Sequence, residues 1–127
     1  MPFGFDQRFD YRVDILPRRN LITVGLAGTE LARTTRSLLV DEQDHGLVFY
    51  LPRDDVRMDL LARTDHTSVC PYKGTATHWA LAGGDGSSIA WTYENPISQV
   101  ARITDHIAFY QDLVSLTVGQ APYIGPR

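Results

Sequence analysis

The sequence contains a single cysteine, Cys70, and a single lysine, Lys73, three positions further along the chain. One cysteine cannot form an internal disulfide or a zinc or iron–sulfur site built from several cysteines. A metal would instead need His66 and His78 with carboxylates, for which the sequence signal is weak, so we predict no metal and no cofactor. The other eleven basic side chains are all arginines. Against this bias, the lone lysine indicates a position that needs a compact, titratable amine and that a guanidinium would not serve.

Neither a strong positive charge nor a long apolar run is present. The formal net charge is −3 and arginines alternate with acids, which argues against a general nucleic-acid binder because such a protein needs a basic surface. No stretch approaches the roughly 20 apolar residues of a membrane span. Asp6 and Arg8 interrupt the N-terminal segment, so we expect no signal peptide, a cytoplasmic location, and neither a nucleic-acid nor a membrane partner.

The length of 127 residues predicts one domain with one core. We expect a loosely held N-terminal arm over residues 1–10, the domain over residues 11–118 and a C-terminal tail over residues 119–127.

Apolar and polar residues alternate with a period of two along most of the chain, which predicts an all-β, mainly antiparallel domain. Residues 60–71 are less regular. A single helical turn is expected after Pro52, and Asn95-Pro96 predicts one short helix near residues 96–103, with Asn95 as its cap. The predicted strands are 11–15, 21–27, 30–40, 47–51, 73–82, 87–93, 106–110 and 114–118, with 30–40 and 47–51 paired as a hairpin.

The segment YLPRDDVRMDLL, residues 50–61, places many charges beside a buried strand. In one interpretation Arg53 pairs with Asp55 or Asp59 and pins the loop. In the other, Arg53 or Arg57 holds a carboxylate or phosphate group through two parallel hydrogen bonds.

The segment TDHTSVCPYKGTATHW, residues 64–79, places His66, Cys70, Tyr72 and Lys73 within eight positions. A nucleophilic thiolate needs a pKa lowered by a nearby cation or imidazole, and both are available here. An aspartate, Asp65 or Asp59, could orient His66. Alternatively, Cys70 is a small buried hydrophobic residue and His66 ties down a loop.

Aromatic residues concentrate in the second half of the chain, where packing in the core is their ordinary role. Trp91 and Tyr93 share one strand face and could instead line a pocket. We interpret His45, His78 and His106 as surface or loop residues.

These motifs resemble a signature of the bacterial and fungal family known as domain of unknown function 427: Pro-Arg-acid-Asp-Val, a histidine, Cys-Pro-Tyr-Lys-Gly, Trp-x-Tyr and Ala-Phe-Tyr. The resemblance covers roughly residues 11 to 115. The matching residues are Pro52, Arg53, Asp55, Val56, His66, Cys70, Pro71, Tyr72, Lys73, Gly74, Trp91, Tyr93, Pro96, Phe109 and Tyr110.

The resemblance implies a β-tent-like domain, in which two antiparallel sheets lean together over a cleft. Methionine sulfoxide reductase B and the drug-binding domain of cereblon share that fold class, and they usually carry a four-cysteine zinc site that this chain cannot build. One label of the family mentions nucleotidyl transfer. The sequence shows no Gly-rich phosphate loop and no paired metal-binding carboxylates that would support it.

We therefore expect a small-molecule enzyme, a Cys/His-dependent hydrolase or transferase acting on a small anionic or carbonyl compound in one cleft. The alternative is a non-catalytic binding module with an aromatic cleft, and a third interpretation is an interaction protein or homodimer. The expected catalytic residues are Cys70, His66 and Lys73, and the expected substrate-binding residues are Arg53, Asp55, Tyr72, Trp91 and Tyr93.

Overall fold

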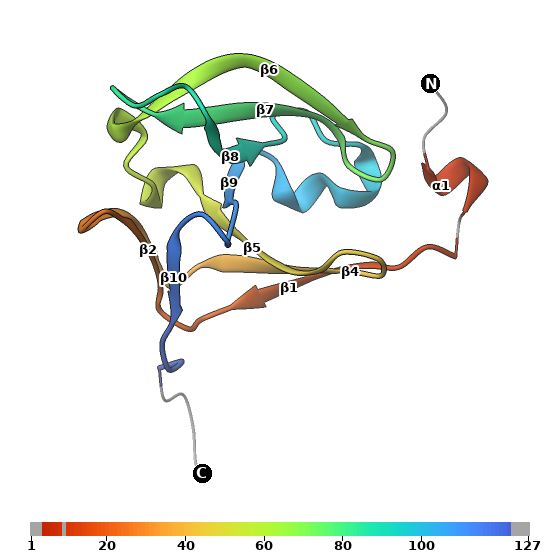
Figure 1. The fold of residues 1–127 in the computed structure, drawn as a ribbon. Helices are drawn as coiled ribbons and strands as arrows, with labels where there is room; N and C mark the ends of the chain where they lie inside the picture. Colours follow the sequence, from red (N-terminus) through yellow and green to blue (C-terminus); the bar gives the residue numbers. More distant parts are fainter. Residues whose placement is uncertain (1–3, 9, 123–127) are drawn as a thin grey trace.

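The computed structural model describes residues 4–8 and 10–122, with the side chains of residues 6 and 7 left out. These residues form an all-β fold of two antiparallel sheets, as the sequence predicts (Figure 1). In spatial order, the larger sheet consists of β1 (Val13–Arg18), β4 (Ser37–Glu42), β5 (Gly46–Pro52), β9 (His106–Phe109), β8 (Ser88–Thr92), β7 (Gly74–Leu81) and β6 (Leu61–Cys70). The smaller sheet consists of β10 (Ser115–Val118), β2 (Ile22–Leu26) and β3 (Thr29–Thr34).

The larger sheet is bent so that its two ends face each other. Strands β1, β4 and β5 form a lower wing in Figure 1, β6, β7 and β8 form an upper wing, and β9 joins them. The joint is short, because β5 pairs with β9 through the three residues Tyr50, Leu51 and Pro52. The bend therefore creates a concave face between the wings and a convex face behind the joint.

The period of two divides the central strands between these faces. Leu51, Ile107 and Phe109 are fully buried on the convex face, where they pack with Ile22 and Val24 of the smaller sheet in one hydrophobic core. The neighbouring positions Tyr50 and Ala108 belong to a second core on the concave face. The smaller sheet thus covers the outside of the bend, and the inside is left for the candidate site.

Several local predictions are confirmed. β4 and β5 pair as a hairpin, β7 and β8 pair across the Gly-rich turn, and Arg53–Asp55 forms a turn of 3-10 helix after Pro52. The expected short helix is a 3-10 helix over Ser98–Ile103, but its capping prediction is wrong: Ile97, not Asn95, holds the cap position, and no side chain caps it. A second 3-10 turn, Met58–Leu60, precedes β6.

The single long strand predicted over residues 30–40 is wrong, because the chain breaks there into β3 and β4, which belong to different sheets. The hydroxyl of Thr34 accepts the N–H of Arg36 at 2.9 Å and donates to Asp55 at 2.7 Å. Such a side-chain turn offers the backbone an alternative to the sheet ladder, and it lies where β3 ends.

The irregular segment predicted over residues 60–71 is instead β6, the ten-residue edge strand of the upper wing. Most of its side chains are exposed, so the apolar alternation that marks a half-buried strand is missing.

Both ends of the described chain are attached to the domain. The N–H of Gly4, in the short helix α1 (Gly4–Gln7), donates to the carbonyl of Pro71 at 2.7 Å, and the ring of Phe5 packs edge-on against Tyr72. The expectation of a loosely held arm is therefore wrong for Gly4 and Phe5. Gly119 N–H donates to the carbonyl of Leu21 at 2.7 Å, and residues 123–127 of the predicted tail lie outside the described residues. Within the described residues, no helix is long and apolar enough to cross a membrane.

Candidate functional site

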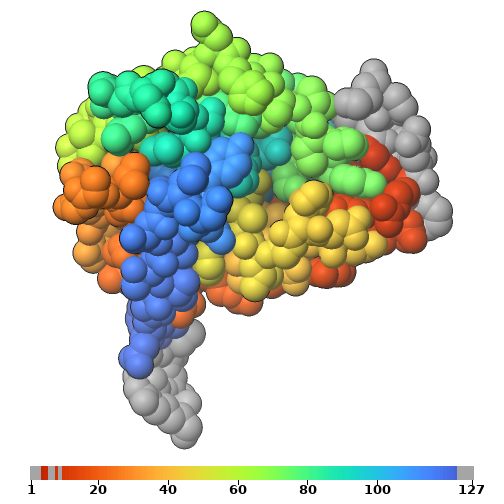
Figure 2. All heavy atoms as spheres, viewed as in Figure 1, coloured from red at the N-terminus to blue at the C-terminus, as the bar shows by residue number. Residues whose placement is uncertain are grey.

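A cavity of about 370 Å³ lies between the two wings of the larger sheet. Strands β4, β5 and β6 contribute residues two positions apart, because alternate side chains point to the concave face. On the face shown in Figure 2, the yellow β5 segment lies below the green β6–β7 segment. The lining residues are Val40, Glu42, His45, Gly46, Val48, Tyr50, Ser68, Cys70, Lys73, His78, Trp91, Tyr93 and Tyr110. All of them belong to the larger sheet or its connections, so the cleft is inside one bent sheet and not between two sheets.

One end of the cavity holds a buried ion pair between Lys73 and Glu42, whose side chains are 6% and 5% exposed. The Glu42 carboxylate also accepts the hydroxyl of Tyr11 at 2.6 Å, and His45 Nε2 lies 3.5 Å from it. Burial and the Glu42 carboxylate raise the pKa of Tyr11, so its phenol stays protonated and acts as a donor. The positive charge of Lys73 is thus balanced by the negative charge of Glu42.

The other end holds a network of hydrogen bonds and ring contacts around His78. Its Nε2 lies 2.8 Å from the Ser68 hydroxyl and its Nδ1 lies 3.5 Å from the Tyr110 hydroxyl. The ring of His66 lies 4.3 Å from the His78 ring. Burial, with a smaller effect of His66, lowers the pKa of His78, and burial raises the pKa of Tyr110. At neutral pH this end therefore presents a neutral imidazole and a neutral phenol.

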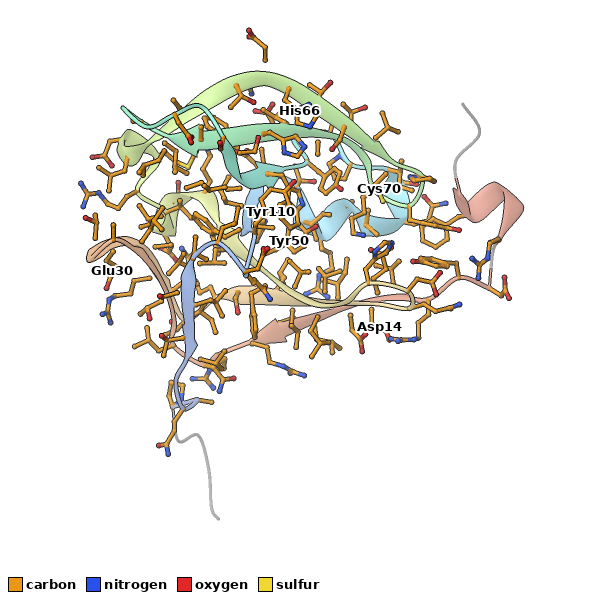
Figure 3. All side chains as sticks on the ribbon, viewed as in Figure 1. Asp14, Glu30, Tyr50, His66, Cys70 and Tyr110 are labelled. Atoms are coloured by element: carbon orange, nitrogen blue, oxygen red, sulfur yellow. The ribbon has the colours of Figure 1, made fainter. Side chains whose placement is uncertain are left out.

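Aromatic side chains form the middle of the cavity. Trp91 Nε1 donates to the hydroxyl of Tyr50 at 3.1 Å, and the Trp91 ring lies 4.7 Å from that of Tyr110. Burial raises the pKa of Tyr50 and of Tyr93, and Tyr50 and Cys70 add to the increase at Tyr93. Figure 3 shows Tyr50 and Tyr110 between the wings, with Cys70 toward the α1 end. The rings therefore give the middle of the cavity flat and mainly apolar walls, and the hydroxyls of these tyrosines stay protonated.

The structure brings four of the predicted site residues together, since Cys70, Lys73, Trp91 and Tyr93 all line the cavity. Cys70 is half-buried there, neither open to solvent nor sealed in the core.

Arg53 and Asp55 are not among the lining residues. Arg53 donates to Asp105 at 3.0 Å, and its guanidinium lies over the Trp79 ring at 5.1 Å. Asp55 accepts from Thr34 and from Arg36. Ion pairs with distant parts of the chain therefore hold Arg53 and Asp55, and the predicted pairing of Arg53 with Asp55 or Asp59 is wrong.

Tyr72 and His66 lie beside the cavity and are also absent from its lining. The Tyr72 ring stacks on Tyr11 at 3.7 Å, which joins the N-terminal segment to the β6–β7 turn. His66 is exposed on β6 and reaches the network through its contact with His78.

The interpretation of His78 as a surface residue is wrong, because it lies on β7 with 3% of its surface exposed. Gly74 and Ala76, which face the same side of β7 as His78, are small. The sequence around His78 therefore shows no strong apolar alternation. Glu42 and Ser68 were not predicted either. In the sequence, Glu42 belongs to the polar run of residues 41–46, which is typical of a loop. Ser68 lies in a segment without clear periodicity. For Tyr110, the sequence signal is the Ala-Phe-Tyr motif of the family.

Among the described residues, no group of three or more His, Cys, Asp or Glu side chains is arranged to hold a metal ion. Besides the amine of Lys73, which is paired with Glu42, the donors of the site are phenols, hydroxyls, an indole and an imidazole, which suit hydrogen bonding to an organic molecule.

The fold and the cavity define an all-β protein with one bent sheet around a pocket of small-molecule size. A comparison with family profiles matches residues 14–120 to the family described as domain of unknown function (DUF427), and the chain belongs to this family. The profile carries the label NTP_transf_9. A comparison with curated proteins finds no match.

Proposed function

We propose that the protein binds a small, uncharged, planar organic molecule in the cavity between the wings. The observation that carries this proposal is the pairing of Lys73 with Glu42 at the cavity wall. The positive charge of Lys73 is balanced by the Glu42 carboxylate, and at the other end of the cavity His78 is neutral because burial lowers its pKa. An anionic ligand would meet no unpaired cation among the described lining residues.

Size and shape support the same conclusion. A volume of 370 Å³ lies at the lower end of the roughly 300–1,000 Å³ of small-molecule sites. Trp91, Tyr50 and Tyr110 provide flat apolar surface of the kind on which a planar ring packs.

The hydrogen bonds favour a ligand with an acceptor group. The oxygen of Tyr50 accepts the indole N–H of Trp91, so its own proton is available to a ligand. The raised pKa of Tyr50 and of Tyr93 keeps both phenols protonated. A carbonyl oxygen on the ligand is the natural partner of such donors.

Benzamide, benzoate and benzylamine test this proposal, because they share a ring and differ in charge. We expect benzamide to quench the fluorescence of Trp91 and to raise the melting temperature, with weaker effects of the other two. The Trp79→Phe variant isolates the signal of Trp91, and Trp91→Phe should abolish it. Tighter binding of benzoate, or no binding of any of the three to the folded protein, would contradict the proposal.

A matched pair of variants checks the location. Tyr50→Phe removes one donor and should weaken benzamide binding about fivefold, the effect of losing one hydrogen bond of about 1 kcal/mol. Tyr72→Phe changes a phenol outside the cavity and should leave binding unchanged.

A hydrolase is the second candidate function. The predicted assembly of Cys70, His66 and Lys73 has weak support, because Lys73 pairs with Glu42 and His66 contacts His78 instead. The hydrogen bond between Ser68 and His78 supports hydrolysis by a different pair of residues.

A further inference from the structure

We infer that Ser68 and His78 form a nucleophile–base pair that cleaves small uncharged carboxylic esters bound in the cavity. This inference rests on the proposed binding function and adds a reaction to it. Ser68 Oγ lies 2.8 Å from His78 Nε2, within the range expected of a nucleophile and its general base. Both residues line the cavity, so the pair faces the space where a ligand would lie.

The fold holds this pair on regular structure. Ser68 lies on β6 and His78 on β7, and these strands pair antiparallel around the Ser68–Ala76 position. His78 is 3% exposed and has neighbours on both ring nitrogens, which fixes its orientation. Ser68 is exposed, so its hydroxyl is accessible to a substrate. A site on paired strands is positioned more accurately than one on loops.

The protonation state suits a general base. Burial lowers the pKa of His78, so the neutral imidazole predominates at neutral pH. For Nε2 to accept the serine proton, Nδ1 must carry the ring proton and donate to the Tyr110 oxygen, 3.5 Å away. The proton of Tyr110 is then left to donate to the acyl oxygen of a bound ester. Tyr110 therefore serves as the group that orients the base.

The reaction balances with water as the only co-reactant. Ser68 Oγ attacks the ester carbonyl carbon while His78 Nε2 takes the hydroxyl proton. The bond to the leaving alcohol breaks, and His78 returns the proton to that oxygen, which leaves an acyl ester on Ser68. Water then attacks the acyl carbon, His78 takes its proton, and the proton returns to Ser68 Oγ as the carboxylic acid departs.

Two uncharged probes test the pair: p-nitrophenyl acetate, and an alkyl fluorophosphonate followed by peptide mapping. We expect the fluorophosphonate to modify Ser68 in the folded protein. Ester cleavage should fall roughly 100- to 10,000-fold in Ser68→Ala and in His78→Gln, the usual contribution of acid–base catalysis. Thr67→Ala, which removes the adjacent hydroxyl outside the cavity, should keep the full rate. Modification of another residue, or full esterase activity in Ser68→Ala, would overturn the inference.

If His78→Gln does not fold, the role of His78 can still be tested by measuring how the rate of ester cleavage by the native protein depends on pH. Because the active form needs a neutral His78 with a lowered pKa, the rate should stay constant down to about pH 6.5 and fall only below it. A rate that already falls above that pH would contradict the assignment of His78 as the base.

Failure of this inference and failure of the binding proposal are distinguishable. Benzamide binding without reaction at Ser68 would reject the catalytic pair and keep the ligand site. Reaction at Ser68 without benzamide binding would reject the proposed ligand class and keep the catalytic pair.

Discussion

The buried pair of Lys73 and Glu42 shows how a single side chain can determine the character of a site. Glu42 gathers Lys73, the Tyr11 hydroxyl and His45 around one carboxylate that is almost fully buried. The desolvation of two charges is costly, and the pair tolerates burial because each charge has the other as a partner. The arrangement makes this end of the cavity electrically neutral.

Removing the lysine should therefore damage the fold and not only the cavity. In Lys73→Met the Glu42 carboxylate stays buried without its counter-ion, and we expect the free energy of unfolding to drop by about 3–5 kcal/mol. Urea denaturation followed by circular dichroism measures this. As a control, Arg57→Met breaks an exposed pair with Asp59 and should cost less than about 1 kcal/mol.

The double variant Glu42→Gln/Lys73→Met separates charge from packing. Since no unpaired charge remains, it should recover most of the lost stability. A double variant as unstable as Lys73→Met would show that the unpaired charge of Glu42 is not the cause of the loss.

His78 should make stability depend on pH. Its pKa is lowered in the folded state, first by burial and then by His66, so the unfolded chain takes up a proton before the folded protein does. Stability is therefore full above the unfolded pKa of about 6.5 and is lost as the pH falls from there through the folded pKa. Urea midpoints of the native protein and of His78→Gln, measured from about pH 8 to about pH 5, check this.

We expect the acid-side loss to be smaller in His78→Gln than in the native protein. The His106→Gln variant is the control, since His106 lies at the start of β9 and outside the cavity lining. Identical pH slopes in all three proteins would assign the acid sensitivity to other groups.

Individual residues also show how far sequence can predict this site. Cys70 and Lys73 were predicted from a dense motif, and Trp91 and Tyr93 from their shared strand face; all four line the cavity. Arg53 lies in an equally dense motif, yet it is held by Asp105, fifty-two positions later in the chain. A partner that distant leaves no local pattern, so only the structure reveals it.

Among the elements, the β6–β7 hairpin carries Ser68, Cys70, Lys73 and His78 of the site. Its turn begins after Cys70, includes Lys73 and ends at Gly74, whose φ of +116° is a conformation that other residues rarely adopt. The turn thus fixes Cys70 and Lys73 relative to each other.

We expect Gly74→Ala to lower stability by about 1–3 kcal/mol, because alanine is strained at this φ. Thermal unfolding measures the loss, and benzamide binding should weaken with it. Gly25→Ala offers a control in β2, where the nearest atom to the added Cβ is 3.4 Å away and no positive φ is required. Equal stability of the two variants would show that the turn adapts without strain.

Elements also differ in how readily the sequence predicts them. The β4–β5 hairpin is predictable because two apolar runs, residues 38–40 and 47–51, flank a polar turn that closes with Gly46. The edge strand β6 is not, because solvent faces most of its side chains. The break after Thr34 is also hidden, since it depends on a hydrogen bond to Asp55.

The molecule as a whole depends on the convex core that joins its two sheets. Phe109 is fully buried there, on the short strand β9 that connects the wings. The same core contains Ile22 and Val24 of the smaller sheet. Loss of packing at this position should therefore affect both sheets together.

Phe109→Ala should lower the free energy of unfolding by about 3–5 kcal/mol, the usual cost of deleting a buried aromatic ring. Leu113→Ala is the control, since Leu113 is 48% exposed and should change stability little. Guanidinium denaturation followed by both tryptophan fluorescence and circular dichroism would measure the loss. Two separate transitions, instead of one, would show that the sheets unfold independently.

The bent sheet has a consequence for how quickly a ligand can bind. Both walls of the cavity belong to one continuous ladder of backbone hydrogen bonds, running from β4 and β5 through β9 to β8, β7 and β6. Swinging the wings apart would break that ladder, so we expect the proposed ligand site to be preorganised. Little conformational entropy is then lost on complex formation, and association should follow a single step whose rate rises linearly with ligand concentration.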